Sequence, residues 1–499
     1  MTGAVWYIRL HQGKTLWSWS SRPHGKTSRE ESAIGTQTLA LPRDKRRIQW
    51  LLLAAVGVFL LPGLLLGPAK DAAVFAVVGE QMLRGDLPYR DVWDHKPPGI
   101  YGMTALAALM PGSTWPWVWA LSVAATTISA LLVYRVAGAV AAVFAAIGMS
   151  VYPASFGGGH TETFAATLAA LSLVTGHRHR QTGAGLLSVA ALAFSFQALP
   201  VVAAHVVLAG RNWVRYLVGC ALGVVVIVLA FVVAGVAAEA ADALVRYSRA
   251  YLGLEAGLDE WALISIVLLP FAFLPLYVRW AKLSQLERAA AAWAICGLLL
   301  LAFQGRHLGH YVVPVVVPLS ILAGRAIRIP TARRVMAIAG TCAVGLAVAV
   351  SIPMWIVHRS AATAAIGDYV ASLAPAGKPI LVWGMDARVY LRASRPVAGE
   401  YPYLLPLVTP GYTTPAMIND WLDDLQAQPP AVIVDSEAAH QYWDATDDFL
   451  RPPPPGYAGG RTLDLLEPFR VFVAAHYELS AEIAGRKIYV LLEQPQGDT

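Results

Sequence analysis

The chain has 499 residues, of which 57% are hydrophobic and only 14% charged. This balance excludes an ordinary soluble globular protein, because too little polar surface remains to keep such a chain in solution. We attribute the formal net charge of +6 to the basic residues that set the membrane orientation, as described below. We therefore expect no nucleic-acid partner.

Residues 1–44 are polar and rich in serine and basic side chains. They are too long and too polar for a cleaved signal peptide. We therefore expect a disordered cytoplasmic tail at 1–44, a membrane domain at 45–358 with a first outer loop at 68–102, and an extracytoplasmic α/β domain at 359–499.

Apolar segments follow one another from residue 48 to residue 357, and a helical span needs about 20 residues or somewhat fewer. The pattern predicts a polytopic α-helical membrane protein with about eleven spans, at 48–67, 115–135, 137–153, 160–176, 183–198, 199–209, 213–236, 262–278, 288–304, 310–324 and 333–357. The segment 199–209 is too short to cross alone. The pair around Pro200 is therefore two spans, one kinked span or a re-entrant hairpin.

Basic residues in short loops favour the cytoplasmic side. With the N-terminus inside, inner loops hold about twice as many Lys and Arg as outer loops. An odd number of spans then exports everything after Trp355. Cys220, Cys296 and Cys342 all fall within predicted spans, so we expect no disulfide.

Ionisable residues gather at the outer ends of the spans. His205 is the clear exception within a span, and we expect it to be neutral and satisfied by a neighbouring carbonyl. The clustered residues are Asp71, Asp91, Asp94, His95 and Lys96 in the first outer loop, His160 and Glu162 in the second, and Arg306, His307 and His310 between the ninth and tenth spans. This clustering predicts a site on the outer face, built from three loops.

These residue types suit group transfer at a phosphate-activated centre. Lys96 and Arg306 can hold a phosphate, one as a point charge and the other as a bidentate fork, and His310 can add a donor. A carboxylate such as Asp71 can accept a proton from an acceptor hydroxyl within hydrogen-bond reach. The Pro-Pro-Gly turn at 97–99 fixes the backbone after Lys96.

Other interpretations remain open. The basic residues can be interfacial side chains that snorkel to lipid headgroups. Asp94 and His95, beside His307 or His310, can also form a divalent metal site. Asp91, Asp94, His160 and Glu162 are further substrate-site candidates.

From Ala361 onward the composition approaches ordinary globular values. The β-rich runs 380–384, 431–435 and 487–493 predict strands, and the patterns 414–426 and 463–476 predict helices. Their alternation indicates a small α/β sandwich of about 130 residues. The run Pro452–Pro455 predicts a stiff surface loop, and the absence of a Gly-rich phosphate fingerprint disfavours nucleotide binding.

The segment PYRDVWDHKPPGIY, residues 88–101, resembles the first-loop signature of bacterial membrane glycosyltransferases of the GT-C superfamily. These enzymes are related to dolichyl-phosphate-mannose protein mannosyltransferases and to the lipid A aminoarabinose transferase. Asp71, Thr161-Glu162 and the turn at 305–324 are also similar to family positions. The resemblance covers residues 45–493.

The resemblance implies inverting transfer of a sugar from a polyprenyl-phosphate donor to a lipid, glycan or protein acceptor, at the outer face of a bacterial inner membrane. It implies Asp71 as catalytic base, Lys96 as a ligand of the donor phosphate, and Arg306 and His310 as further phosphate contacts. His95 stands where the aminoarabinose enzymes place a Glu implicated in metal contact. We expect no required cofactor, and a divalent metal stays an open alternative.

The connection 237–260 is long for a loop between spans, and it can cover the acceptor or lipid cleft. Two rival functions remain. A transporter or flippase of lipid-linked sugars would need internal repeats and broken helices with polar groups at the midplane, and the sequence shows neither. A sensor or assembly scaffold would leave the cluster in the first loop unexplained.

Overall fold

A computed structural model describes residues 8–11, 14–17, 43–252, 261–304, 307–357, 361–436 and 465–492. The chain divides into two units, Met1–Arg47 and Ile48–Thr499, and each is described by itself. In the first unit β1 (Ile8–His11) pairs with β2 (Lys14–Trp17) as an antiparallel hairpin. Most of the predicted disordered tail lies outside the described residues, so that expectation stays a prediction.

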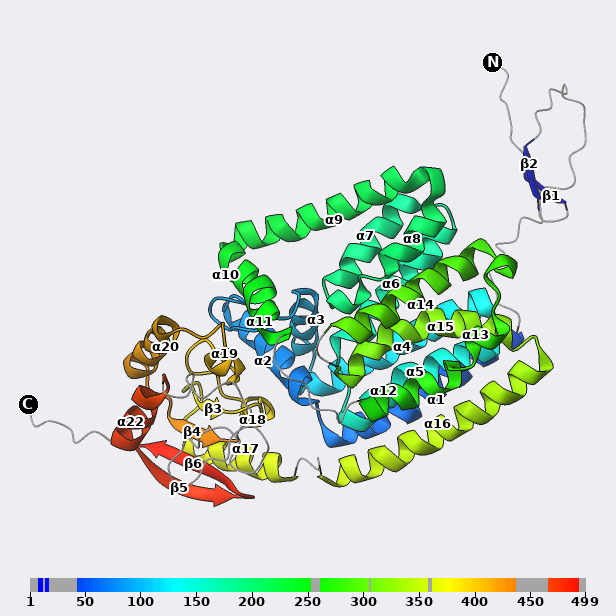
Figure 1. Cartoon of the computed structure of the whole chain (residues 1–499). Coiled ribbons are helices and arrows are strands. Elements are labelled where there is room, and N and C mark those ends of the chain that lie inside the picture. Colours follow the sequence, from blue (N-terminus) through cyan, green and yellow to red (C-terminus); the bar gives the residue numbers. More distant parts are fainter. Residues whose placement is uncertain are drawn as a thin grey trace, which may run out of the picture. The chain divides into compact units, whose positions relative to one another are not determined.

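Helices make up the second unit as far as residue 357 (Figure 1). They are α1 (Arg43–Leu66), α2 (Lys70–Arg84), α3 (Gly99–Ala108), α4 (Thr114–Ala137), α5 (Ala139–Phe156), α6 (Thr161–His177), α7 (Gln181–Leu192), α8 (Val201–Ala209), α9 (Trp213–Ala234), α10 (Ala237–Ala241), α11 (Ser248–Leu252), α12 (Trp261–Leu268), α13 (Leu274–Tyr277), α14 (Gln285–Phe303), α15 (Val313–Ala326) and α16 (Pro330–Val357). A π-helical turn, Asp242–Tyr247, joins α10 to α11.

Among the described residues, six helical stretches are long and apolar enough to cross a membrane, and they make the chain a multi-pass membrane protein. They are Gln49–Leu66, Thr114–Ala137, Phe196–Ala234, Gln285–Phe303, Gly309–Ala326 and Pro330–Ile352. Helices occupy the other predicted spans too, but they are shorter. The predicted count of about eleven is therefore not confirmed and stays a prediction.

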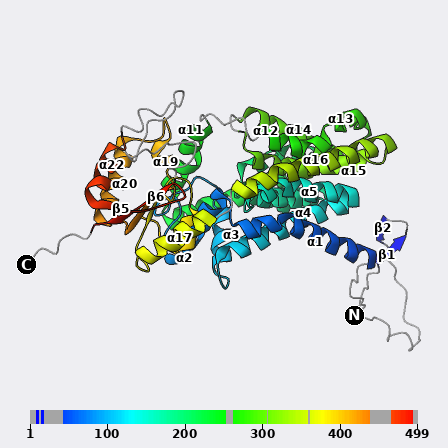
Figure 2. The same ribbon diagram turned by 90° about the horizontal axis from the view of Figure 1, so that it is seen from below.

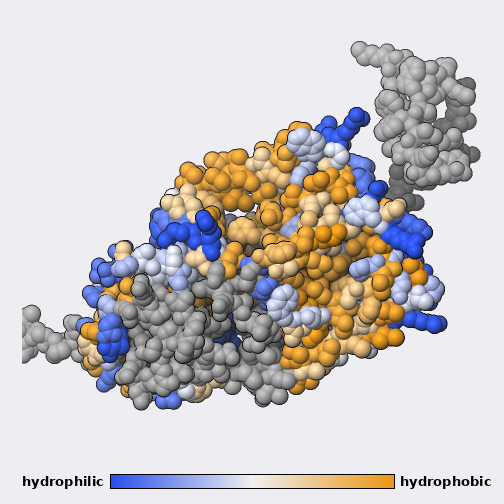
Figure 3. Space-filling model, viewed as in Figure 1, coloured by the Kyte–Doolittle hydropathy of each residue, from blue (hydrophilic) through white to orange (hydrophobic). Residues whose placement is uncertain are grey.

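The helices of the membrane region differ sharply in burial, as expected for a bundle surrounded by lipid. α15 lies at the centre, with 94% of its apolar stretch buried, and it packs against α4, α5, α6 and α14. In α9 only Tyr216 and Gly219 are buried, and Val233 is 86% exposed. Apolar side chains accordingly cover much of the visible surface (Figure 3). Water would disfavour so large an apolar surface, whereas acyl chains accept it.

His205 is fully buried, and the structure corrects the partner that we expected for it. Its Nε2 atom lies 2.8 Å from the hydroxyl oxygen of Ser172, and its ring stacks on Tyr216 at 4.4 Å. The Ser172 hydroxyl donates to the Ala184 carbonyl at 2.7 Å, so it accepts from His205. A hydroxyl therefore relays the contact to the carbonyl that we had expected to be the direct partner.

The C-terminal region of the second unit is an α/β fold. Its elements are α17 (Ala361–Leu373), β3 (Leu381–Trp383), α18 (Arg388–Ala393), α19 (Leu405–Val408), α20 (Pro415–Ala427), β4 (Val432–Asp435), α22 (Glu467–His476), β5 (Tyr477–Ile483) and β6 (Arg486–Leu491). The sheet order is β3-β4-β6-β5, with β3 and β4 parallel and the other pairs antiparallel.

The three predicted strands of this region and the helix α20 are confirmed, and α22 forms over the later part of its predicted range. α20 and α22 lie beside the sheet in Figure 2, and their Trp421 and Phe469 rings pack with Trp383 of β3 to form the core. Strand β5 was missed because it is an exposed edge strand with polar residues. The predicted Pro452–Pro455 loop lies outside the described residues.

Candidate functional site

The predicted first outer loop, residues 68–102, is a folded scaffold rather than a flexible connection. Helix α2 carries nine buried residues and ends at Gly85, whose left-handed backbone (φ 105°) closes the helix with hydrogen bonds to the last carbonyls. Helix α3 then packs back on α2. The hydroxyl of Thr104 in α3 donates to the Phe75 carbonyl of α2 at 2.7 Å. The segment between the two helices, residues 86–98, is thereby held at both ends.

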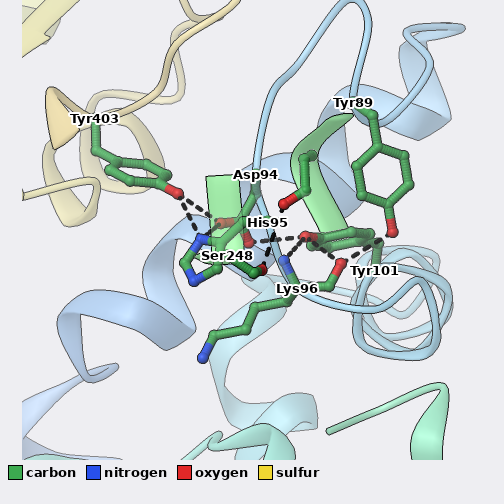
Figure 4. A network of polar contacts seen from close by, with 8 residues as sticks. Tyr89, Asp94, His95, Lys96, Tyr101, Ser248 and Tyr403 are labelled. Carbon is green, nitrogen blue, oxygen red and sulfur yellow. Dashed lines mark hydrogen bonds and ion pairs between the residues drawn. The ribbon is translucent and has the colours of Figure 1, made fainter. Parts of the chain in front are cut away.

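A buried hydrogen-bond network fixes the backbone of Lys96 (Figure 4). The Tyr101 hydroxyl accepts from the Lys96 amide at 3.0 Å and donates to Asp94 Oδ2 at 2.8 Å. The Tyr89 hydroxyl donates to the Lys96 carbonyl at 2.9 Å. Tyr403, from the C-terminal region, donates to Asp94 Oδ1 at 2.7 Å. With both backbone groups held, the Lys96 side chain points away from the network.

The protonation states in this network follow from burial and contact. Burial opposes ionisation of Asp94, but contacts with His95, Tyr403 and Tyr101 outweigh it and lower the pKa of Asp94. Burial lowers the pKa of His95, and the nearby Asp94 carboxylate offsets this only in part. Near neutral pH, Asp94 is therefore a carboxylate and His95 a neutral imidazole. The pKa of Tyr403 is raised well above its usual value by burial and by Asp94, so its hydroxyl remains a donor.

Lys96 faces the other predicted residues. Burial alone would lower its pKa, but the Tyr311 hydroxyl and the carboxylates of Glu162 and Asp71 outweigh burial and raise it. The ammonium lies 5.9 Å from the centre of the Tyr311 ring. Asp71 stands in the first turn of α2. The structure thus places the Lys96 ammonium close enough to the carboxylates of Asp71 and Glu162 to interact with both electrostatically.

Two histidines, His160 and His310, also interact with Asp71 and Lys96. The rings of His160 and His310 stack with centres 5.0 Å apart, and Tyr152 contacts both. Asp71 is close enough to interact electrostatically with each ring. Glu162 Oε2 lies 3.9 Å from His310 Nε2, and its other oxygen accepts from Ser195 at 3.0 Å.

Each stacked histidine keeps one buried ring nitrogen unsatisfied. Among the described residues, His160 Nε2 and His310 Nδ1 have no hydrogen-bond partner. Both residues are only 3% exposed. Leaving a buried polar atom unpaired costs about 1–3 kcal/mol, so these nitrogens indicate a place for a polar ligand.

Three consecutive glycines place His160 beside α2. Gly157, Gly158 and Gly159 all have positive φ, at 105°, 76° and 82°, which L side chains rarely adopt. A Cβ on Gly157 would lie 2.8 Å from the Gly67 carbonyl oxygen, and one on Gly159 would lie 2.7 Å from Ala72 Cβ. The glycine run therefore packs directly against the start of α2, next to Asp71.

The connection that we expected to cover the cleft is described as far as Leu252. Its Tyr247 and Tyr251 rings lie 4.9 and 5.0 Å from the His95 ring. Asp242 accepts from the Tyr412 hydroxyl at 2.7 Å, and the Arg246 guanidinium lies 4.3 Å from the centre of the Tyr412 ring. This segment therefore packs over His95 while it is fastened to the C-terminal region.

Not every predicted residue joins the site. Asp91 is exposed, pairs with Arg90 at 3.1 Å and accepts from the Leu87 amide at 2.8 Å, which is a turn-stabilising role. His307 packs against Trp261 with ring centres 4.2 Å apart. Arg306 lies outside the described residues.

The metal alternative stays a prediction for His95. Within the described ranges, no group of three or more His, Cys, Asp or Glu side chains has the arrangement of a metal site. The Nδ1 atom of His95 is engaged with Tyr403 at 3.1 Å and Asp94 at 3.3 Å.

Several residues of the site were missed from the sequence. Tyr101 closes the first-loop motif, so its position next to that motif was an available signal, and the Gly-Gly-Gly-His run was another. Tyr403 gave no local signal, because its partner Asp94 is 309 positions away.

Two solved structures of one protein share this fold. The crystal structure of ArnT from Cupriavidus metallidurans in the apo state aligns with a TM-score of 0.57 and 17% identity, over 91% of this chain and 100% of that one. The same protein bound to undecaprenyl phosphate gives 0.58 and 16%, over 90% and 99%. Arabinosyltransferase EmbB from Mycobacterium smegmatis aligns at 0.40 and 15%, over 60% of this chain and 32% of that one.

Models of known protein families and curated protein sequences give no match to the chain. The chain has the fold of ArnT, and the resemblance expected from the first-loop motif is confirmed at the level of the fold.

Proposed function

We propose that the protein is a glycosyltransferase that moves a sugar from a polyprenyl-phosphate donor to a lipid, glycan or protein acceptor. The fold supports this proposal, because ArnT has been solved with undecaprenyl phosphate bound. The observation that carries it is the convergence of Asp71 and Lys96 with the unsatisfied nitrogens of His160 and His310. A phosphate accepts hydrogen bonds from imidazole N–H groups and attracts an ammonium.

In the proposed reaction Asp71 accepts the proton of the acceptor hydroxyl. The hydroxyl oxygen attacks the anomeric carbon from the face opposite the phosphate and forms the new glycosidic bond. The bond between the anomeric carbon and the phosphate oxygen breaks, and its electron pair leaves on polyprenyl phosphate. Lys96, Arg306 and His310 stabilise the phosphate, and the configuration at the sugar inverts.

Asp71→Asn tests the base. We expect transfer from a purified polyprenyl-phosphate sugar to fall by about 10²- to 10⁴-fold, which is the usual contribution of a general base. The donor is chosen after mass analysis of cell-envelope glycans from a strain that lacks the gene. Asp91→Asn is the matched control, because Asp91 is exposed, and it should retain transfer. Near wild-type transfer by a folded Asp71→Asn protein would remove Asp71 as the base.

We infer further that the chain has about eleven spans in a bacterial inner membrane, with residues 1–44 in the cytoplasm and residues 359–499 outside. We infer no required cofactor, with a divalent metal near His95 as the alternative. Transfer that survives a metal chelator would support the absence of a required metal. Flux of the lipid-linked sugar through proteoliposomes without transfer would favour a flippase instead.

A further inference from the structure

A pocket borders α2 on the side of the helix that carries Glu80. It has a volume of about 700 Å³ and is lined by the end of α1, α2, the α3–α4 turn, α17 and α18. Glu80 lines it, and Glu80 is nine positions after Asp71, which is about two and a half helical turns. Because two and a half turns separate them, Glu80 and Asp71 face opposite sides of α2.

The polar wall of the pocket carries three guanidinium groups, those of Arg84, Arg388 and Arg392. Arg388 donates to the Asp386 carboxylate through Nε and Nη2, at 2.5 and 2.9 Å. Arg392 donates to the Asp368 carboxylate through the same two atoms, at 2.7 and 2.8 Å. In the described part of the chain, both leave their Nη1 groups without a hydrogen bond. These N–H donors remain available to an anion.

Arg84 adds a third guanidinium, which interacts electrostatically with Glu80 and Asp86 without a close ion pair in the described part of the chain. Its Nη1 donates to the uncharged side chain of Gln81 at 2.8 Å, and the described residues place no carboxylate within ion-pair distance of it. The one acidic residue in the lining, Glu80, accepts instead from the Thr114 hydroxyl at 2.6 Å. Two of the three guanidinium groups are already paired with carboxylates, so what the lining offers an anion is the unused N–H donors of Arg84, Arg388 and Arg392.

The rest of the lining indicates an amphiphile. Leu66 is the last residue of α1, and Thr114 and Trp115 open α4. Both helices hold candidate spans, so the pocket lies where apolar helices meet polar structure, at the depth of lipid headgroups. Leu66, Leu83 and Trp115 supply apolar surface beside the arginines.

We propose that this pocket binds the phosphate group of a membrane phospholipid. Its arginines hold the phosphate with their unused N–H groups, while the apolar side chains at the ends of α1 and α4 contact the glycerol and the first acyl carbons. Glu80, Leu83 and the arginines of this site take no part in the proposed transfer reaction, so we expect lipid binding and transfer to be independent.

Native mass spectrometry of the delipidated full-length protein in detergent tests the proposal, with phosphatidylglycerol as the probe. We expect the variant carrying both Arg84→Gln and Arg392→Gln to bind at least tenfold more weakly than the wild type. Arg178→Gln, at an exposed position after α6, is the matched control and should bind normally. Ala108→Trp, which fills the pocket from α3, should also abolish binding. Equal melting temperatures exclude loss of folding.

Unchanged binding by the double variant, or an equal loss in Arg178→Gln, would overturn the proposal. Competition with soluble glycerol 3-phosphate distinguishes a lipid ligand from a water-soluble phosphate. Glycerol 3-phosphate should not displace the lipid at equal concentration, and effective displacement would show that the pocket takes water-soluble phosphates. Asp71→Asn should retain lipid binding. Lipid binding is therefore measured separately from transfer, and failure of the proposed transfer function would not change it.

Discussion

Asp94 is a buried carboxylate whose two oxygens are both occupied by tyrosine hydroxyls, so its contribution to the fold depends on those donors. Tyr101 comes from the same loop and Tyr403 from the C-terminal region. Because Lys96 shares Tyr101 with Asp94, the same contacts set the direction of the Lys96 side chain.

Tyr403→Phe should destabilise the protein by about 1.5–3 kcal/mol, the usual worth of a hydrogen bond to a charged group. Chemical denaturation in detergent measures this. Transfer should also fall, since Lys96 loses its fixed support. Tyr369→Phe is the matched control: its hydroxyl bonds Ser480 at 2.9 Å in an exposed place, so its effect should be within about 0.5 kcal/mol. Equal effects of the two variants would contradict the positioning role of Tyr403.

Asp386 gives the C-terminal region a sensitivity to acid. The carboxylate is 1% exposed, and although burial opposes its ionisation, Arg388, Arg486 and Thr363 lower its pKa to about 2. The unfolded value is about 3.9. A depressed pKa stabilises the fold above the unfolded value and stops doing so as pH falls through the folded value.

Hydrogen exchange of β3 and β4 should therefore rise as the pH falls from about 4 to about 2. The exchange rates are corrected for their intrinsic pH dependence. Asp386→Asn should already show fast exchange at pH 7, because it leaves two arginines without their anion. Asp368→Asn breaks an ion pair with Arg392 in which the Asp368 side chain is 59% exposed, so this variant should behave like the wild type. A flat profile in the wild-type protein would count against this account of Asp386.

At the scale of elements, the glycine run between α5 and α6 decides how close the second loop comes to α2. Gly158 and Gly159 have the same kind of backbone, but only Gly159 is pressed against a neighbour. A Cβ at Gly158 would meet Pro153 Cβ at 3.6 Å, an ordinary contact, whereas at Gly159 it would meet Ala72 Cβ at 2.7 Å.

Gly158→Ala should cost only the left-handed backbone strain, about 1–2 kcal/mol, and leave transfer largely intact. Gly159→Ala should cost more and lower transfer strongly, because α2 and its Asp71 must move. The comparison of unfolding and transfer for the two variants separates backbone strain from close approach. Similar transfer in both would mean that the close approach is unimportant.

The sequence predicted elements whose signal is local. Long apolar runs gave the helices, and β-rich runs bounded by Gly, Pro or Asp gave β3, β4 and β6. It also grouped Asp71, Lys96, His160 and Glu162 in one site, because charged residues at the same ends of successive spans are expected to lie on one side of the membrane. It missed Tyr403 and the stacking of His160 on His310, since such contacts depend on how loops fold together.

At the scale of the whole molecule, orientation relative to the membrane is the prediction on which the site depends. In a variant without Cys220, Cys296 and Cys342, a single cysteine at Ala376, an exposed position, should react with a membrane-impermeant maleimide in intact spheroplasts. A cysteine at Arg178, in the short turn after α6, should react only after lysis. The reverse pattern would place the site in the cytoplasm and end the proposed reaction at the outer face.

The bond between Tyr403 and Asp94 joins positions 309 residues apart, and this separation has a consequence for biosynthesis. The first loop leaves the ribosome long before residue 403 is added. Asp94 then has only one of its two tyrosine donors, so the loop matures late, after nearly the entire polypeptide has been inserted. A truncated chain ending before β3 would thus hold every residue of the motif at 88–101 and still lack its finished shape.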